Sequence, residues 1–577
     1  MTVPRSQCVF GLLVCVCGLA GACGPGAGPS DSADSSEAPT ALRTPWFTEV
    51  TAEVGLDVTA ESWPDGSYAA PEIMGPGVAL LDYDGDDDLD VLQLRMPLPG
   101  SPDAPAPNRL FQQQDDGTFV DISAGSGLDD TGFAQGVAVG DVNNDGAPDV
   151  YFANYGRDAL YRNNGDGTFT NVTAAAGVGE LDLWSASTTF CDYDADGDLD
   201  LYVTHYLDYD PDVSCQGRSG HPGYCAPQTF DGVPDKLYRN IGGGRFQDVT
   251  TSAGLRWVDG GRKAKGLGVV CVDLSGDGLL DFYVANDGEA NQLWINLGDG
   301  SFADEAIIRG VAVNRYGMPE ASMGIALGDV DGDGGLDLLL THLGGENNTL
   351  FSSGSGPLYR DRTPEAGLAV HDQALTGFGC RLFDFDLDGD PDLAVVNGRV
   401  QRGPAADSAE VSPFWSHFAE PNLLFENDGG GAFSNVTPTE IDFGRRVEVS
   451  RGLAIGDVDD DGDLDLLLSN GDNSLRIYRN GAAGSGGHWL RVRARVAGRD
   501  APGTRVRLIA ADREFLGLVL PGGSYMSSGD PRAHFGLGAT DRVDRIEVTW
   551  PDGHREQFPG SQADRQVELT KGTGSPA

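Results

Sequence analysis

Acidic residues recur in this 577-residue sequence at a spacing that suits a divalent cation. The pattern D-x-[DNS]-x-D-G-x-x-D occurs seven times with one substitution at its glycine, and each copy lies between two apolar runs. Oxygen ligands at positions 1, 3 and 5 of a tight loop converge on one point, the carbonyl of position 7 adds a ligand, and the position-9 carboxylate closes the shell. A plain turn would not require acidic residues at the same positions in every copy. We therefore predict seven Ca²⁺-binding loops, numbered loop 1 to loop 7 in chain order.

The predicted ligands follow the same five positions in every loop. In loops 1 to 4 they are Asp82, Asp84, Asp86, Asp88 and Asp90; Asp141, Asn143, Asp145, Ala147 and Asp149; Asp192, Asp194, Asp196, Asp198 and Asp200; and Asp273, Ser275, Asp277, Leu279 and Asp281. In loops 5 to 7 they are Asp329, Asp331, Asp333, Gly335 and Asp337; Asp384, Asp386, Asp388, Asp390 and Asp392; and Asp457, Asp459, Asp461, Asp463 and Asp465.

Three of the loops depart from the full pattern. Asp87 replaces the glycine at position 6 of loop 1, although aspartate tolerates a left-handed backbone better than most residues. Asn143 and Ser275 each remove one negative charge from their loops. Occupancy of the loops that begin at Asp82 and Asp273 therefore stays open.

The residues that flank each loop predict two short β-strands joined by it, for example GVALLDYD and LDVLQL around loop 1. A second pattern, N-x-L-[YFW]-x-N-x-G-D-G-x-F, has alternating apolar residues around a turn and predicts a hairpin. Four strands per repeat, repeated seven times, are typical of a β-propeller. The segment Phe47 to Thr51 resembles a fourth strand without its own blade, so we expect it to complete the seventh blade.

These repeats resemble the FG-GAP/VCBS repeats that form the seven-bladed propeller of integrin α-subunits, and they cover about residues 45–485. After them come motifs that resemble the ASPIC/UnbV domain of the cartilage acidic protein-like family, including lipoproteins of bacterial type. The motifs are His488-Trp-Leu490, Gly503-Thr-Arg-Val506, Gly522-Gly-Ser-Tyr525, His534-Phe-Gly-Leu-Gly538 and Trp550-Pro-Asp-Gly553. The segment 497–503 departs from the family pattern, so no function of that loop is carried over. The resemblance implies an all-β chain: an integrin α-like seven-bladed β-propeller followed by a small C-terminal β domain.

The start of the sequence predicts export. Arg5 precedes an apolar run from Val9 to Ala22, which is too short to span a bilayer but suits a secretory signal. Cleavage after Ala22 would place Cys23 first, so ordinary processing and lipoprotein processing cut at the same bond, and lipidation of Cys23 stays open.

The resulting domain prediction is a signal peptide at 1–22, a flexible tether at 23–44, the propeller at 45–485, the ASPIC/UnbV-like domain at 486–570 and a tail at 571–577. Gly481 to Gly487 has the composition of a linker between the last two domains.

The remaining cysteines lie in two kinds of context. Cys215 and Cys225 lie in a Pro- and Gly-rich insertion with little apolar material, which predicts a disulfide between them in an exported protein. Cys191, Cys271 and Cys380 precede metal loops on predicted strands, and we expect buried free thiols there.

The net charge of −49 excludes nucleic acid as a partner, because the surface would repel phosphates.

Two functions remain open. The first is a surface-anchored or secreted calcium-binding module that acts in adhesion by engaging an extracellular protein or glycan, with membrane contact only through a lipid at Cys23. The second is an extracellular enzyme that acts on a polysaccharide or similar polymer in the propeller mouth. His205 and His342 follow strands and could face a shared surface, but neither has a partner at metal-ligand spacing. A deep central pocket with converging His, Arg and carboxylates that are not used for metal would favour the enzyme. A filled channel with ligand-free metal sites on its rim would favour the binding module.

Overall fold

The computed structural model describes residues 46–57, 66, 68–96, 108–217, 220–255, 264–354, 356–370, 374–439, 441–511 and 513–577. The predicted signal peptide, the tether and Cys23 lie outside the described residues. Thr44–Ala577 forms one compact unit. Among the described residues, no helix is long and apolar enough to cross a membrane.

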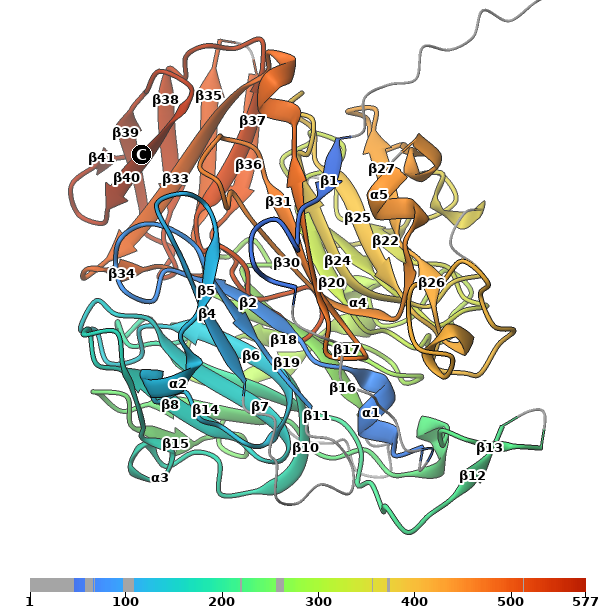
Figure 1. Cartoon of the computed structure of the whole chain (residues 1–577). Helices are drawn as coiled ribbons and strands as arrows, with labels where there is room; N and C mark the ends of the chain where they lie inside the picture. Colours follow the sequence, from blue (N-terminus) through green and yellow to red (C-terminus); the bar gives the residue numbers. More distant parts are fainter. Residues whose placement is uncertain are drawn as a thin grey trace, which may run out of the picture. The chain divides into compact units, whose positions relative to one another are not determined.

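Antiparallel pairing arranges the main strands of residues 47–480 as five four-stranded sheets and one eight-stranded sheet (Figure 1). We describe these strands as seven groups of four, called units 1 to 7, each with one predicted metal loop between its first two strands; units 2 and 3 together make the eight-stranded sheet. Units 1 to 3 contain β2 (Val78–Leu81), β3 (Asp90–Gln93), β4 (Arg109–Gln113) and β5 (Phe119–Asp121); β6 (Phe133–Gly140), β7 (Asp149–Arg157), β8 (Ala159–Asn163) and β9 (Phe169–Asn171); and β10 (Asp182–Cys191), β11 (Asp200–His205), β14 (Lys236–Asn240) and β15 (Phe246–Asp248). Units 4 and 5 contain β16 (Gly266–Val272), β17 (Asp281–Asn286), β18 (Gln292–Asn296) and β19 (Phe302–Asp304); and β20 (Ile325–Gly328), β21 (Asp337–Leu340), β22 (Thr349–Ser352) and β23 (Arg360–Asp361). Units 6 and 7 contain β24 (Gly377–Phe383), β25 (Asp392–Asn397), β27 (Leu423–Asn427) and β28 (Phe433–Asn435); and β30 (Ser450–Gly456), β31 (Asp465–Asn470), β32 (Leu475–Asn480) and β1 (Phe47–Glu49).

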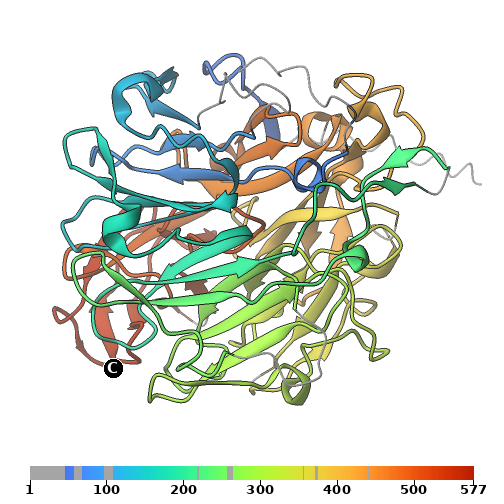
Figure 2. The ribbon, with the colours of Figure 1, turned by 90° about the horizontal axis from the view of Figure 1, so that it is seen from below.

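The first strands of the units contact one another in a closed ring, in the order β2, β6, β10, β16, β20, β24, β30 and back to β2. These strands are buried almost throughout, whereas the fourth strands are partly exposed, as in β9, where two of the three residues are exposed. β1 pairs with β32 through Phe47 and Asn480, so the predicted closing strand completes the last unit. The all-β propeller fold predicted from the repeats is therefore confirmed. Figure 2 shows the units lying side by side.

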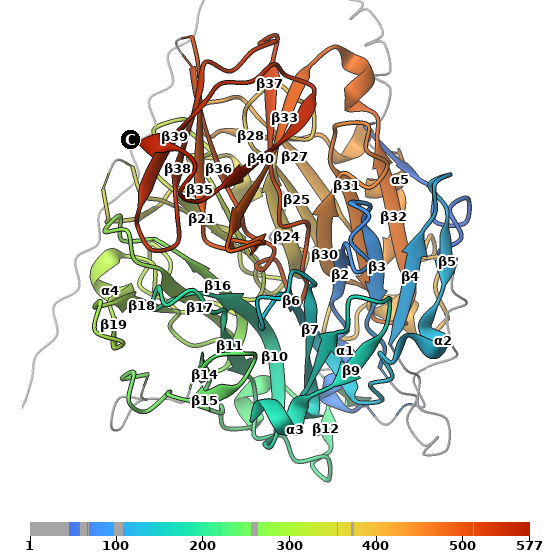
Figure 3. The ribbon, with the colours of Figure 1, turned by 90° about the vertical axis from the view of Figure 1, so that its left-hand side faces the viewer.

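The C-terminal residues form two further sheets (Figure 3). One contains β33 (His488–Val496), β34 (Arg499–Asp500), β37 (Ala533–Gly538) and β40 (Arg565–Thr570). The other contains β35 (Arg505–Ala510), β36 (Arg513–Leu518), β38 (Arg545–Thr549), β39 (Arg555–Pro559) and β41 (Ser575–Pro576). Their shared apolar core includes Leu490, Leu508, Phe535 and Trp550, and we call residues 488–577 the tail domain.

Helices are short and lie in the connections. They are α1 (Ala70–Met74), α2 (Ser123–Ser126), α3 (Thr173–Ala176), α4 (Ala306–Arg309), α5 (Ile441–Arg445), η1 (Pro227–Thr229), η2 (Leu368–Val370), η3 (Trp415–His417), η4 (Thr437–Thr439) and η5 (Ala482–Ser485). Two more short strand pairs, β12 (Cys215–Gln216) with β13 (Pro222–Gly223) and β26 (Glu420–Pro421) with β29 (Val447–Glu448), lie outside the units. The β12–β13 hairpin projects away from the units in Figures 1 and 2.

The structure confirms one cysteine prediction and corrects another. Cys215 and Cys225 are joined by a disulfide, as predicted for the insertion. Cys191 and Cys271 are also joined, so the prediction of free thiols is wrong for these two residues. They lie 80 residues apart in the sequence, on β10 and β16, which become neighbours only when units 3 and 4 pack together. Cys380 is free and buried, as predicted.

We expect both disulfides in protein purified from an oxidising compartment. Closing loops of 10 and 80 residues stabilises the fold by about 3 and about 4.5 kcal/mol in the chain-entropy model. Mass spectrometry of non-reduced peptides should find Cys191 linked to Cys271, Cys215 linked to Cys225, and a free Cys380. Free thiols at either pair would contradict the assignment.

Candidate metal loops and the filled channel

The position-9 aspartate ties each loop to the rest of its unit. In loop 7, Asp465 accepts one hydrogen bond from Val458 N at 2.9 Å and one from Asn480 N at 2.8 Å. The first fixes the loop backbone, and the second fixes the end of the third strand. The same two backbone donors reach all seven position-9 residues, Asp90, Asp149, Asp200, Asp281, Asp337, Asp392 and Asp465.

The position-1 aspartate folds the loop back on itself. Gly462 N donates to Asp457 Oδ2 at 3.1 Å, and Gly462 has φ +102°, which glycine adopts without strain. Asp87 occupies this place in loop 1 with φ +74° and donates its backbone N–H to Asp82 at 3.3 Å. The expectation that aspartate would tolerate this conformation is confirmed.

Three carboxylate oxygens lie within 4.8 Å of one another in each of five loops. The residues are Asp82, Asp84 and Asp86; Asp192, Asp194 and Asp200; Asp329, Asp331 and Asp333; Asp384, Asp386 and Asp392; and Asp457, Asp459 and Asp465. Loops 2 and 4 contribute a neutral Asn143 or Ser275 at position 3 instead of a third carboxylate.

Four buried carboxylate oxygens in these loops have no hydrogen-bond donor among the described residues: Asp192 Oδ1, Asp331 Oδ1, Asp457 Oδ1 and Asp463 Oδ1. Burial is the main cause that raises the pKa of Asp90 to about 8 and of Asp457 to about 7. A carboxylate cluster of this kind needs a positive charge, and oxygen-only donors suit a hard cation such as Ca²⁺. The donor set therefore fits calcium, while binding itself and the position-7 carbonyl ligands stay predictions.

An asparagine at the end of the third strand links neighbouring units. Asn296 Nδ2 donates to Tyr193 O in loop 3 at 2.8 Å and to Leu280 O in its own unit at 3.1 Å. Asn163, Asn240, Asn427 and Asn480 make the same contact with the preceding unit. Gln113 closes the ring by donating to Val458 O in loop 7 at 2.9 Å. This linking residue is the second asparagine of the N-x-L-[YFW]-x-N pattern. From the sequence, the pattern predicted a hairpin but not the contact between units.

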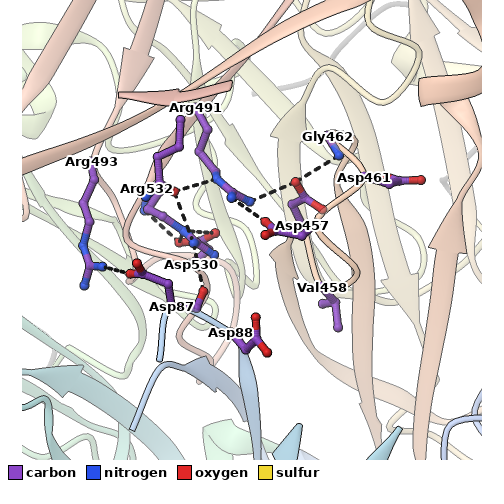
Figure 4. A network of polar contacts seen from close by, with 12 residues as sticks. Asp87, Asp88, Asp457, Val458, Asp461, Gly462, Arg491, Arg493, Asp530 and Arg532 are labelled. Carbon is purple, nitrogen blue, oxygen red and sulfur yellow. Dashed lines mark hydrogen bonds and ion pairs between the residues drawn. The ribbon is translucent and has the colours of Figure 1, made fainter. Parts of the chain in front are cut away.

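Arginines of the tail domain contact the metal loops (Figure 4). Arg491, 5% exposed, pairs with Asp457 at 2.9 Å and also with Asp460. Arg493 pairs with Asp87 at 2.6 Å. Arg532, held by Asp530, lies in the same network and donates to Asp87 O at 3.3 Å.

Further tail side chains donate to backbone carbonyls of other loops. Arg499 reaches Gly197 O at 2.9 Å, and Arg505 reaches Asp273 O at 3.0 Å. His534 contacts Gly462 O at 2.9 Å, and burial is the main cause that lowers the pKa of this histidine to about 4. These backbone carbonyls face the tail domain only when the metal loops are folded. The contacts of the tail domain therefore depend on the conformation of the metal loops.

A segment of the tail domain, residues 519–530, enters the space enclosed by the first strands. We call it the plug. It makes backbone hydrogen bonds with units 1, 2, 5 and 7: Leu80 N to Ser528 O, Val137 N to Met526 O, Ile325 N to Ser524 O, and Asp530 N to Ile455 O. Arg381 of unit 6 donates to three plug carbonyls, those of Leu520, Pro521 and Gly522. The plug therefore packs along the inner strands, and cavities of about 390 and 470 Å³ remain beside it toward the metal loops.

Tyr525 at the tip of the plug is fully buried. Its ring packs edge-on against Phe378 at 4.9 Å between centroids, and the guanidinium of Arg451 lies 3.9 Å from the centre of the same Phe378 ring. Arg451 also donates to Ile73 O, in α1, at 2.8 Å. We call the space enclosed by the first strands the channel. Side chains of the plug and of the units thus also pack at the end of the channel remote from the metal loops.

The two histidines considered as candidates are structural. His205 and His342 are 2% and 1% exposed, and burial is the main cause that lowers the pKa of each to about 3. Neither faces a shared open surface, and both are neutral at physiological pH.

Comparison with known proteins agrees with this architecture. A model described as FG-GAP-like repeat matches residues 82–152, 141–203, 273–340 and 384–468, and one described as ASPIC and UnbV matches residues 495–576. Cartilage acidic protein 1 of Xenopus tropicalis is 27% identical over 545 residues, covering 88% of this chain and 74% of the relative. The Homo sapiens protein of the same name is 28% identical over 451 residues, and the chain matches 61% of its length.

Solved structures with some likeness include an Agrocybe aegerita lectin specific for non-reducing terminal N-acetylglucosamine, at 16% identity and TM-score 0.40 over 68% of this chain and 88% of that one. The BP39L lectin of Burkholderia pseudomallei is 11% identical with TM-score 0.39, over 71% of this chain and 97% of that one. By the family models and the curated relatives, the chain is similar to proteins with FG-GAP-like repeats followed by an ASPIC and UnbV region, cartilage acidic protein 1 among them.

Proposed function

We propose that the mature chain is an exported, calcium-loaded binding module that engages an extracellular protein or glycan. The observation that carries the proposal is the filled channel: the plug occupies the space between the first strands, and Tyr525 packs against Phe378 at its inner end. Polymer-degrading chemistry in a propeller mouth needs an open pocket with titratable groups aimed into it. The filled channel therefore favours binding over catalysis.

The binding surface is proposed at the ends of the first strands remote from the metal loops, because the tail domain contacts the loops. Half-buried aromatic residues gather at this end, including Tyr155, Tyr209, Phe230 and Phe414. The rings of Tyr155 and Tyr209 are 5.9 Å apart, and Phe230 lies 5.1 Å from Tyr209. Aromatic rings that present one apolar side are the usual anchors of recognition surfaces.

Export and anchoring complete the proposal. The apolar run to Ala22 would direct secretion, and a lipid on Cys23 followed by the tether would hold the module at an outer-membrane or cell surface. Two disulfides support an oxidising location. Without the lipid the same module would be secreted.

The test is a binding screen of the chain from Cys23 onward against immobilised glycans and surface proteins, in millimolar calcium and in excess chelator. We expect specific ligands in calcium and reduced binding in chelator. Release of reducing ends from a polysaccharide by the purified chain would instead support the enzyme.

Substituting Asp461→Ala is expected to remove one bound calcium ion. Extracellular calcium modules bind at about 10⁻⁴–10⁻³ M, so loss of one site at millimolar calcium costs about 1 kcal/mol of unfolding free energy. Native mass spectrometry and denaturant unfolding in calcium measure both changes. Asp116→Ala is the matched control, because Asp116 accepts hydrogen bonds from Thr118 in a plain hairpin turn. Equal metal counts for wild type and Asp461→Ala would contradict the assignment of loop 7.

A further inference from the structure

In units 3 and 7 the residue before the linking asparagine of the third strand is an arginine that contacts the metal loop of the same unit. In unit 3 it is Arg239, whose Nε lies 2.7 Å from Asp194 and whose Nη2 lies 3.0 Å from Asp196. In unit 7 it is Arg479, whose Nε lies 3.2 Å from Asp459. These carboxylates occupy positions 3 and 5 of their loops, so the arginines place a positive charge directly on the predicted cation ligands.

In unit 1 the same place holds a neutral residue. Gln112 Nε2 donates to Asp84 Oδ2 at 2.7 Å, which is again the position-3 carboxylate. The contact therefore follows from the register of the third strand rather than from the charge of the side chain.

Unit 6 carries the opposite charge at this place, Glu426. Its register is the same, because Asn427 N donates to Asp392 at 2.8 Å just as Asn240 N donates to Asp200 at 2.7 Å. Loops 3 and 6 each have five aspartates, but their arginine partners differ. Loop 3 is paired with Arg239 and with Arg499, which lies 3.7 Å from Asp192. Loop 6 is paired with Arg513, which lies 3.7 Å from Asp390, and has Glu426 at the place of Arg239. Loop 6 therefore concentrates more negative charge than loop 3.

We propose that a charged residue preceding the linking asparagine tunes the calcium affinity of its own loop, so that loop 6 fills at lower calcium concentration than loop 3. The inference rests on the proposed calcium binding and assigns a specificity role to Glu426 and Arg239. A neighbouring negative charge strengthens the attraction of the loop for a dication, and a neighbouring positive charge weakens it. The number of ligand charges is also what tunes calcium affinity among protein sites. The chain would then respond to calcium in steps over a wide concentration range.

The experiment is a calcium titration of the mature chain in chelator-buffered solution, with bound ions counted by native mass spectrometry and affinities measured by calorimetry. Arg239→Gln should tighten the loop 3 site about tenfold, and Glu426→Gln should weaken the loop 6 site about tenfold. Arg239→Lys keeps the charge and should stay within about threefold of wild type. Arg157→Gln, at the exposed far end of β7, is the surface control and should change nothing.

The outcomes separate this inference from the proposed function. No bound calcium in any variant would overturn the proposed function. Bound calcium with affinities unchanged in both Arg239→Gln and Glu426→Gln would overturn the inference alone. The two variants lie in different units, so a folding defect in one leaves the other as a complete test.

Discussion

Removing calcium with excess chelator is expected to lower the melting temperature of the mature chain by roughly 3–10 °C. Seven sites that each stabilise by about 0.5–1.5 kcal/mol at millimolar calcium sum to several kcal/mol. An unfolding entropy of about 2.1 cal/mol/K per residue converts that loss into the stated shift. The physical cause is repulsion between carboxylates that lie within 4.8 Å of one another once the cation is gone. Differential scanning calorimetry in calcium and in chelator measures the shift.

Magnesium provides the control for this experiment. It sheds water reluctantly and prefers a rigid octahedral shell, so at equal concentration it should restore only part of the stability. Superimposable melting curves in calcium and in chelator would contradict the calcium assignment for all loops together.

Substituting Gly77→Ala is expected to lower the free energy of unfolding by at least about 3 kcal/mol. A Cβ at Gly77 would lie 1.8 Å from the carbonyl oxygen of Met526, so the plug backbone must move. That movement would break the neighbouring hydrogen bond between Leu80 N and Ser528 O. Chemical denaturation followed by tryptophan fluorescence measures the change.

Gly484→Ala is the matched control, since an added Cβ there meets no atom within 4 Å. Gly136→Ala distinguishes the effect of the plug from the effect of packing between units. Its Cβ would lie 2.0 Å from Ala186 O of the next unit and would not meet the plug. Wild-type stability of Gly77→Ala would show that the channel is not filled as described.

Local patterns predicted the parts of the fold that depend on local geometry. The loops, their strands and the left-handed backbone at Asp87 all follow from spacing within about nine residues, and the repetition of that unit indicated the propeller. Closure by β1 was also predictable, because Phe47 begins a strand that lacks its own unit.

Features formed between distant segments were not predictable in this way. Cys191 and Cys271 each read as a lone buried thiol, since pairing depends on the packing of two units. The plug sequence of the tail domain contains Gly522 and Tyr525, which mark a motif but carry no periodicity that points to a channel. Gly481 to Gly487 has linker composition, yet Ala482 is fully buried and a Cβ on Gly487 would lie 2.7 Å from Leu387. The division into two domains stays a prediction.

Ring closure by β1 also sets the order of events during synthesis. Thr51, next to β1, accepts a hydrogen bond from Ile477, 426 residues later in the chain. At roughly 5–20 residues per second, the N-terminal strand would wait about 20–85 s for its partner. During that interval the apolar face of unit 1 lacks unit 7, and the plug that fills the ring has not yet been made. We therefore expect the ring to close only after its last unit and the plug have been synthesised.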